Sequence, residues 1–439
     1  MQTEVSLRDE VAELLQELIR LDTVNPPGNE TIAAQHLRAY LERSGVECEL
    51  YARAPERANL VARIRGSGGG SSLALLSHTD TVLADPAEWE RNPWGGELVA
   101  GEIWGRGALD MKGEVAASAV AIASLARDGW RGTGDLIFIA SADEEVNEGF
   151  GMPWLCERHP DAVRADFSLN EGAGERLELG GRGYYLCAAA EKMSSPFRLR
   201  VRGRSGHASM PGIADNALVK AAPLIEKLGA YEPVPRIGPE VEALVRTLLD
   251  GEVPAADQVV SRVSAISPLL GAFVEPLLGV TFSPTLIRAS QKRNVIPALC
   301  DVTVDCRLLP GQTQAEAEQL VREVLGGAEY ELEWLEGQGG TRSPIATPLW
   351  DAIAAWVGQT DPGARPLPVV VAGFTDSHWL REAFGTVAYG FFPARHMDPE
   401  TAALLVHSAN ERVPVGDLEL GVDFFRYAAR AVCGDEPAR

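Results

Sequence analysis

Two short apolar runs constrain the fold of this chain more than any other feature. Residues 73–76 (Leu-Ala-Leu-Leu) and 136–140 (Leu-Ile-Phe-Ile-Ala) lack the polar alternation of a strand with one solvated face. Such runs form strands buried on both faces, as in a parallel sheet covered by helices. A helix is predicted between them at 111–127, because its apolar pattern stops at Gly129. We therefore expect an α/β fold with a mainly parallel central sheet flanked by helices.

The order of predicted elements changes near residue 190. Residues 197–203 alternate apolar and basic side chains, as in a half-exposed strand, and another strand is predicted at 299–308. Together with predicted helices at 215–228 and 314–325, they form a small α+β unit with antiparallel strands. Helices and strands alternate again from residue 348 onwards. The sequence thus predicts a discontinuous first domain, 1–193 and 338–439, with a second domain, 194–337, inserted into it.

Composition and charge restrict the partners of this protein. The chain has a net charge of −22 and an isoelectric point of about 4.8, which disfavours nucleic acids and anionic membranes as partners. No window approaches the roughly 18 apolar residues that a membrane span needs, and the start of the chain lacks the apolar core of a signal peptide. Six scattered cysteines without a CxxC pair indicate reduced thiols. We therefore expect a cytoplasmic protein.

Acidic and histidine residues follow each buried run. His78 and Asp80 come after the first, and the series Asp143, Glu144 and Glu145 comes after the second. The carboxyl ends of parallel strands meet at one edge of a sheet, where ligands bind. Three consecutive carboxylates repel one another unless cations are present. Since imidazole is a common metal ligand and a nearby carboxylate fixes its tautomer, this edge is a candidate metal site.

Three further motifs carry similar residues: a glycine-rich turn that contains Asp110, a strand end that contains Glu171, and a loop that contains His407. Each has a simpler interpretation when taken alone. His78 could be an ordinary hydrogen-bonded histidine, Asp110 a helix N-cap, and the acidic series a solvated face. The set is more informative, because several of its members lie beside apolar runs that otherwise exclude charge.

These five motifs, in this order, resemble the M20 family of metallopeptidases over residues 7–430. The family includes carboxypeptidases, dipeptidases, aminoacylases and deacylating enzymes. The resemblance implies a catalytic domain of the zinc-peptidase type that binds two zinc ions per subunit, with Co²⁺ or Mn²⁺ as alternatives. It implies as metal ligands His78 and Glu171 for one ion, Glu145 and His407 for the other, and Asp110 as the bridge.

The resemblance also assigns the acid–base roles. Asp80 is implied as the acid that orients His78, and Glu144 as the general base. In this scheme the metals lower the pKa of a shared water, and Glu144 passes the proton of that water to the leaving nitrogen. One departure from the family is Met111, where many members have an acidic residue. This change bears on the cis peptide bond often found there, although many carboxypeptidase-like members tolerate it.

The inserted segment resembles the lid and dimerisation domain of the family. His207 resembles the histidine that reaches the partner subunit's site, which implies a homodimer through the lid. Asn294 is implied near the substrate, and Arg307 as the ligand of the substrate carboxylate, for which a bidentate fork is suited. A surface ion pair with Asp305 is the alternative for Arg307. In the first domain, Thr375 is a candidate hydrogen-bonding contact to the substrate.

The implied activity is cleavage of an amide bond next to a free carboxylate, by a carboxypeptidase or dipeptidase acting on short peptides. Residues 235–285 resemble the branch of carboxypeptidase S and the N-fatty-acyl-amino-acid hydrolases. The alternative is an amidohydrolase that deacylates N-acyl amino acids, since the same catalytic set serves both. A non-catalytic scaffold protein is the third hypothesis. It predicts the loss of a metal ligand or of the base, and none is missing.

Overall fold

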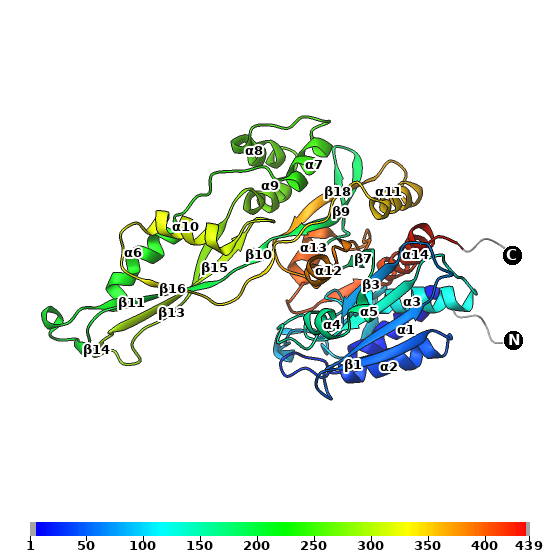
Figure 1. The fold of residues 1–439 in the computed structure, drawn as a ribbon, viewed down its shortest axis with the longest axis horizontal. Helices are drawn as coiled ribbons and strands as arrows, with labels where there is room; N and C mark the ends of the chain where they lie inside the picture. The colour runs from blue at the N-terminus through cyan, green and yellow to red at the C-terminus, as the bar shows by residue number, and fades with distance from the viewer. Residues whose placement is uncertain (1–5, 436–439) are drawn as a thin grey trace. The chain divides into compact units, whose positions relative to one another are not determined.

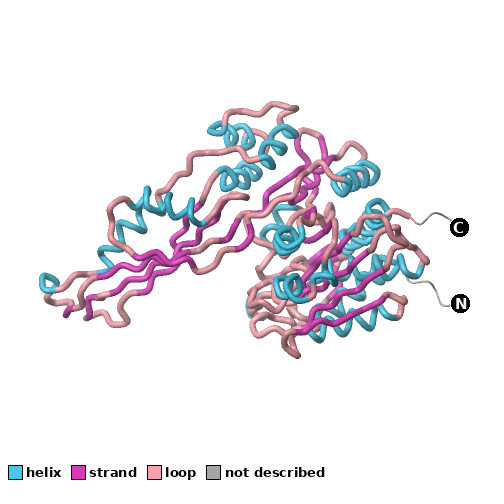
Figure 2. Tube along the Cα trace, viewed as in Figure 1, coloured by secondary structure: helices cyan, strands magenta, loops and turns pink. Residues whose placement is uncertain are grey.

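The computed structural model describes residues 6–435, and the chain divides into two compact units (Figures 1 and 2). Unit 1 contains the chain up to Ala189, Ser343–Val369 and the chain from Thr375. Unit 2 contains Ala190–Arg342 together with Val370–Phe374. The units thus change after Ala189 and Arg342, where the sequence predicts boundaries after residues 193 and 337.

A mixed sheet forms the centre of unit 1. Its strands lie in the order β1 (Glu47–Ala52), β2 (Ala58–Ile64), β6 (Leu136–Ser141), β3 (Leu73–His78), β7 (Phe167–Asn170), β19 (Val387–Gly390), β9 (Arg182–Glu191) and β18 (Arg365–Val371), while β8 (Arg176–Leu179) pairs with β9. The predicted α/β class is confirmed, and β6, β3, β7 and β19 pair in parallel. The pairs β2–β6 and β9–β19 are antiparallel, as are β1–β2 and β8–β9, whose short connections make hairpins. Gly180 and Gly181 form the second turn, and both have positive φ, as a two-residue hairpin requires.

The apolar runs supply the cores on both faces of this sheet. Leu73 and Leu75 join one core, and Ala74 and Leu76 join the other, as the missing alternation predicts. The helices of the first core are α1 (Leu7–Ile19), α2 (Thr31–Glu42), α3 (Lys112–Arg127), α11 (Pro348–Thr360) and α14 (Val415–Cys433). Those of the second are α4 (Met152–Arg158), α5 (Pro160–Val163) and α12 (Ser377–Phe384). Between residues 6 and 435, no helix is both long and apolar enough to cross a bilayer.

A small three-stranded sheet lies beside the glycine-rich turn of unit 1. It consists of β4 (Glu97–Val99), β5 (Glu102–Trp104) and β20 (Arg412–Pro414), all antiparallel. Because β5 precedes the turn that contains Asp110 and β20 follows the loop that contains His407, their pairing brings these two segments together. The remaining short helices here are η1 (Pro86–Glu88) and α13 (Pro399–Leu405).

Unit 2 is built on an antiparallel sheet in the order β16 (Glu331–Trp334), β11 (Phe197–Arg202), β15 (Leu299–Leu308), β10 (Met193–Ser194) and β17 (Gln338–Gly339), with β13 (Thr281–Arg288) paired to β15. Helices α6 (Ala217–Gly229) and α10 (Gln314–Leu325) share its core. A short ribbon joins β12 (Gly206–His207) to β14 (Val295–Ile296), next to η2 (Pro211–Ile213).

The segment between α6 and β13 is helical. It contains α7 (Pro239–Leu248), η3 (Ala256–Gln258), α8 (Val259–Ser264), α9 (Pro268–Val274) and η4 (Glu275–Leu278). The sequence predicts short helices around 241–249 and 260–278, and the structure has short helices over both ranges. Pro268 lacks an N–H group and starts one of them, with Ser267 as its N-cap.

Candidate metal centre

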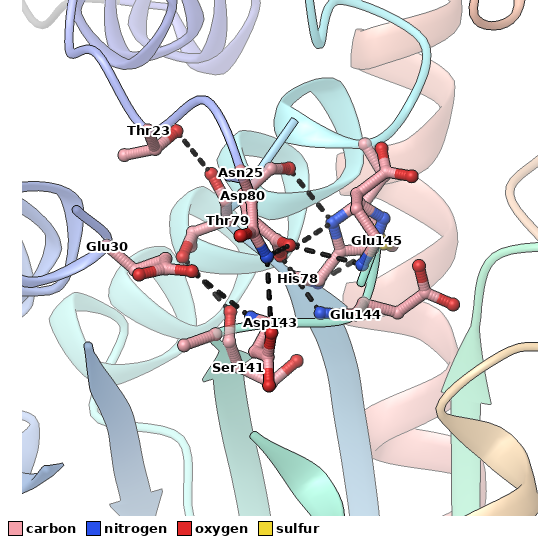
Figure 3. Close-up of polar contacts among 12 residues, drawn as sticks. Thr23, Asn25, Glu30, His78, Thr79, Asp80, Ser141, Asp143, Glu144 and Glu145 are labelled. Atoms are coloured by element: carbon pink, nitrogen blue, oxygen red, sulfur yellow. Dashed lines mark hydrogen bonds and ion pairs between the residues drawn. The ribbon is translucent and has the colours of Figure 1, made fainter. Parts of the chain in front are cut away.

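The strand ends of unit 1 bring the predicted residues together. Strands β3 and β6 are parallel neighbours in which His78 pairs with Ser141, so the loops that follow them lie side by side at one edge of the sheet. Figure 3 shows Asp80, Glu144 and Glu145 gathered around His78 at this edge. Strand β7, on the other side of β3, ends at Asn170, directly before Glu171.

Two groups of potential metal ligands share Asp110. Its Oδ1 lies 3.1 Å from Nε2 of His78, which is itself 3.7 Å from Oε1 of Glu171. Its Oδ2 lies 3.0 Å from Nε2 of His407, which is 3.3 Å from Oε2 of Glu145. In each group of three, the ligand atoms lie within 4.8 Å of one another. One carboxylate therefore offers one oxygen to each group, as a bridging ligand does.

The donor chemistry of these groups fits divalent ions such as zinc, which take imidazole nitrogens and carboxylate oxygens. Burial would lower the pKa of His78, but the carboxylates of Glu171, Asp110 and Asp80 raise it well above its ordinary value. Hydrogen bonds to Asp110 and Glu145 raise the pKa of His407 to about 10. The three ligand carboxylates thus hold protons on the imidazoles, and a metal ion would replace these protons. Oε1 of Glu145 is buried without a hydrogen bond partner among residues 6–435.

Asp80 contacts Nδ1 of His78 and is itself held in place by hydrogen bonds. Nδ1 of His78 lies 3.1 Å from the backbone oxygen of Asp80 and 3.4 Å from its Oδ1. An N–H at Nδ1 suits both acceptors and leaves the lone pair of Nε2 for a metal. The carboxylate of Asp80 also accepts the backbone N–H groups of Glu144 and Glu145 and the side-chain amide of Asn25. Although burial opposes it, His78 and Asn25 lower the pKa of Asp80.

Glu144 and Glu145 leave the same loop in different directions (Figure 3). Glu145 faces His407, whereas Glu144 is in neither ligand group. Burial, together with the nearby carboxylate of Glu171, raises the pKa of Glu144 well above its usual range. A half-buried carboxyl group with a raised pKa is suited to accept and then release a proton near neutral pH.

The peptide bond between Asp110 and Met111 is cis. Met111 is therefore compatible with the cis bond, in line with the members of the family that tolerate this change. The side chain of Met111 is buried, and its sulfur lies 3.2 Å from the backbone nitrogen of His78.

Sequence reasoning missed two buried ion pairs that support the centre. The carboxylate of Glu30 accepts two hydrogen bonds from Arg57, at 2.6 and 2.7 Å, and Arg57 also donates to Asp143 at 3.1 Å. Glu411 accepts from Arg106 at 2.7 Å and from the backbone N–H groups of residues 107, 109 and 110. The first pair holds the loop that carries Glu144, and the second holds the turn that carries Asp110. Glu411 lies close to the loop of His407 in the sequence and Glu30 near no motif, so only their partners reveal these roles.

The loop that contains Thr375 also reaches this sheet edge. Thr375 is buried, and Asp376 beside it accepts a hydrogen bond from Ser141 at 2.7 Å. Burial raises the pKa of Asp376 to about 7. Ser377, the next residue, accepts a hydrogen bond from Asn170. Asp376 is thus a further buried acid of the site that the sequence did not single out.

The other three predicted residues belong to unit 2. His207 is exposed on β12, and its Nδ1 accepts the backbone N–H of Ser209. Asn294 is exposed, and its backbone oxygen accepts from Ala208. Arg307 forms a two-pronged ion pair with Asp305, at 3.0 and 3.1 Å, which is the alternative that the sequence left open. Whether they contact a substrate stays a prediction.

Comparison with known proteins supports the resemblance. Residues 74–431 match the family model of peptidase family M20/M25/M40. Succinyl-diaminopimelate desuccinylases of Cereibacter sphaeroides and Rhodospirillum centenum are each 27% identical to this chain. The first alignment covers 92% of this chain and 94% of the relative, and the second covers 97% and 98%.

Solved structures share the fold. An M20 family metallo-carboxypeptidase from Sulfolobus solfataricus has a TM-score of 0.74 at 18% identity, over 97% of this chain and 99% of the other. Human carnosine dipeptidase 1 has a TM-score of 0.67 at 16% identity, over 97% and 96%. Because the family model covers well over half of the chain, this protein belongs to peptidase family M20/M25/M40, a family of metal-dependent hydrolases that act on amide bonds.

Proposed function

We propose that this protein binds two zinc ions and cleaves an amide bond next to a free carboxylate, as a carboxypeptidase or dipeptidase acting on short peptides. The observation that carries the proposal is the position of Asp110. Its two oxygens lie 3.1 and 3.0 Å from the imidazoles of His78 and His407, one in each ligand group. A bridging carboxylate of this kind is the defining feature of a two-metal hydrolytic site.

Each residue of the centre has a distinct task in this reaction. The two ions, when bound, would polarise the scissile carbonyl and lower the pKa of a water toward about 7. Glu144 takes the proton of that water and delivers it to the leaving nitrogen, for which its raised pKa is suited. Asp80 keeps Nε2 of His78 directed at the metal through the bond at Nδ1. Asp80 also ties the loop of Glu144 to the strand end of His78 through backbone N–H groups.

In our proposal, residues of unit 2 and Thr375 of unit 1 supply the substrate contacts. Arg307 exchanges Asp305 for the carboxylate of the substrate, since the same fork binds either group. Asn294 and Thr375 donate hydrogen bonds to the substrate backbone. His207 reaches the site of a second subunit and helps to hold the oxyanion, so unit 2 acts as a lid and dimerisation domain.

Exposed apolar residues support a dimer through this region. They lie on α6, β13 and β14 and on residues that follow β12 or β14: Met210, Ile213, Leu218, Val219, Leu286, Ile287, Val295 and Leu299. One of them, Val295, pairs directly with His207 in the ribbon. Exposed apolar side chains of this number are typical of a protein interface.

Deacylation of N-acyl amino acids is the second candidate function. The relatives favour it, since two of them, at 27% identity, are named succinyl-diaminopimelate desuccinylases. The metal centre is compatible with either substrate class, because both place a carboxylate beside the cleaved bond.

A substrate panel tests the proposal. Hydrolysis rates are measured on a Gly-X dipeptide and on the matching N-acetyl and N-lauroyl amino acids, with the metal content determined on the same sample. We expect about two zinc ions per chain and a preference for the dipeptide. A preference for an N-acyl amino acid would favour the second candidate, and the absence of metal and of activity after zinc addition would contradict both.

Glu144→Gln tests the general base. We expect this variant to retain its metal and to lose turnover by about 10²–10⁴-fold. Glu148→Gln is the matched control, because Glu148 is an exposed acid on the same loop, and it should turn over at the rate of the parent protein. A Glu144→Gln variant with full activity would remove Glu144 from this role.

His207→Ala tests the contribution in trans. We expect turnover to fall by about 10²–10³-fold, the usual cost of removing an oxyanion donor, with metal content unchanged. Mixed with Glu144→Gln, this variant should form heterodimers that recover activity, since one of their two sites has both residues. No recovery in a mixture that forms heterodimers would refute an exchange of His207 between subunits.

A further inference from the structure

A cavity of about 280 Å³ lies within unit 1, next to the metal-binding carboxylates of Asp110 and Glu171. A volume of this size is several times the roughly 30 Å³ that one water occupies in the liquid. Most of its wall is apolar and comes from Leu109, Phe392, Met397, Ala402, Val406 and Val413. The proposed reaction does not use this space.

Glu114 is the unusual residue of this cavity. It lies on α3, one helical turn after Asp110, and it lines the cavity although only 4% of its surface is exposed. Its Oε1 is buried without a hydrogen bond partner among residues 6–435. Buried polar groups are normally satisfied, and a buried carboxyl without a partner costs free energy. Glu114 is in neither ligand group, so no direct bond to a metal is expected to satisfy its Oε1.

The other acids of the wall differ in their environments. Asp417 is satisfied, because its carboxylate accepts the backbone N–H groups of residues 395, 396 and 397. Glu175 is half-buried and, like Glu114, forms no ion pair with a basic side chain among residues 6–435. No lysine, arginine or histidine of the described residues lines the cavity. Glu114 and Glu175 are therefore two acids on a mostly apolar wall that has no basic side chain of its own.

We propose that this chamber is a substrate subsite for a primary ammonium group carried on an apolar arm. The apolar wall covers the methylene groups of the arm, and Glu114 and Glu175 pair with the ammonium, which supplies the donors that Glu114 lacks. The proposal rests on the proposed amide hydrolysis and narrows its substrates. The arm can belong to the amino acid that carries the free carboxylate or to the acyl group, and the experiment separates these sources.

Two pairs of substrates provide the test. In the first pair, Nα-acetyl-lysine has an ammonium group on the amino acid side, and Nα-acetyl-norleucine lacks it. In the second pair, 6-aminohexanoyl-leucine has an ammonium group on the acyl side, and hexanoyl-leucine lacks it. In the pair whose arm enters the subsite, we expect the cationic substrate to have at least about tenfold higher kcat/KM, mainly because its KM is lower. A buried hydrogen bond to a charged group typically contributes enough free energy for a tenfold effect. The variants are Glu114→Gln and Glu175→Gln, with Glu400→Gln as the control, because Glu400 is exposed on α13 and does not line the cavity.

The proposal predicts that Glu114→Gln abolishes the preference for the cationic substrate and that Glu175→Gln weakens it. Glu400→Gln should leave the preference unchanged. Equal kcat/KM within both pairs for the parent protein, or a preference that survives Glu114→Gln and Glu175→Gln, would overturn the subsite. Loss of metal in Glu114→Gln would also overturn it, because Glu114 would then support the metals instead.

Binding without catalysis separates this proposal from the proposed function. The thermal shift caused by n-hexylammonium is compared with that of hexan-1-ol, using parent protein loaded with zinc. We expect stabilisation by the ammonium alone, and none in Glu114→Gln. If all four amides resist hydrolysis while this shift is present, the proposed activity fails and the subsite stands. If the amides are hydrolysed but the shift is absent, the subsite fails and the activity stands.

Discussion

Replacement of Glu411 by glutamine should damage both the stability and the metal content of this protein. Glu411 is fully buried, and its two oxygens accept four hydrogen bonds, one from Arg106 and three from backbone N–H groups of the turn before the cis peptide. A glutamine of the same shape turns an NH₂ group toward two of these donors and leaves Arg106 buried without its counter-charge. Breaking a buried ion pair costs about 3–5 kcal/mol, so we expect a loss of this size in the free energy of unfolding.

Urea unfolding in the presence of EDTA measures this loss without a contribution from metal, and metal analysis after dialysis measures the effect on the site. Asp417→Asn is the matched control. Asp417 is also fully buried and accepts three backbone N–H groups, but it does not hold the turn of Asp110. We expect both variants to be destabilised and only Glu411→Gln to lose metal. A free energy of unfolding of Glu411→Gln within about 1 kcal/mol of the parent protein's would refute the reasoning, and so would equal loss of metal in both variants.

Three further predictions concern other buried contacts of unit 1 and the pKa of His407. Arg57→Met should lower the free energy of unfolding by about 3–5 kcal/mol, because it leaves Glu30 and Asp143 buried without a cation. Its control, Arg65→Met, removes an exposed ion pair and should lower it by less than about 1 kcal/mol. Equal losses in chemical unfolding would contradict this prediction. Metal binding at pH 7 should release protons and tighten as the pH rises towards 10. The pKa of His407 in the metal-free protein is raised to about 10, so its imidazole is protonated below that pH and must lose the proton to bind a metal. Calorimetry in buffers of different ionisation enthalpy measures the protons released, and a value of zero would contradict this prediction. Gly421→Ala should lower the free energy of unfolding by about 1–3 kcal/mol, since its Cβ would lie 2.1 Å from the ring of Phe392. Gly358→Ala lies on an open helix surface and should raise this free energy by up to about 1 kcal/mol. Equal shifts of the melting temperature in the two variants would contradict this packing.

Much of the fold and of the metal centre could be predicted from local patterns. The run Leu73–His78 is apolar until its last two residues, so its burial on both faces and the position of His78 at its end follow from the same few letters. Parallel pairing then places the end of β6 beside it, because His78 and Ser141 are in register. The sequence therefore indicated which residues gather at this edge, including Asp110, whose bridging position was implied by resemblance.

Other features depend on contacts that local patterns do not contain. Glu411 and Arg106 are 305 positions apart and meet because β20 pairs with β5. The unpartnered carboxyl of Glu114 is visible only once the cavity beside it is known. By contrast, the short helices within residues 260–278 follow from local sequence, since Ser267 and Pro268 are an ordinary helix start.

Anomalous diffraction at the zinc edge, from crystals loaded with zinc, tests the central claim most directly. We expect two peaks, one within about 2.0–2.2 Å of ligand atoms of His78 and Glu171 and one equally close to those of His407 and Glu145, with a different oxygen of Asp110 bound to each. A single peak, or peaks that leave either oxygen of Asp110 without a metal, would contradict the two-metal centre on which the proposed function depends.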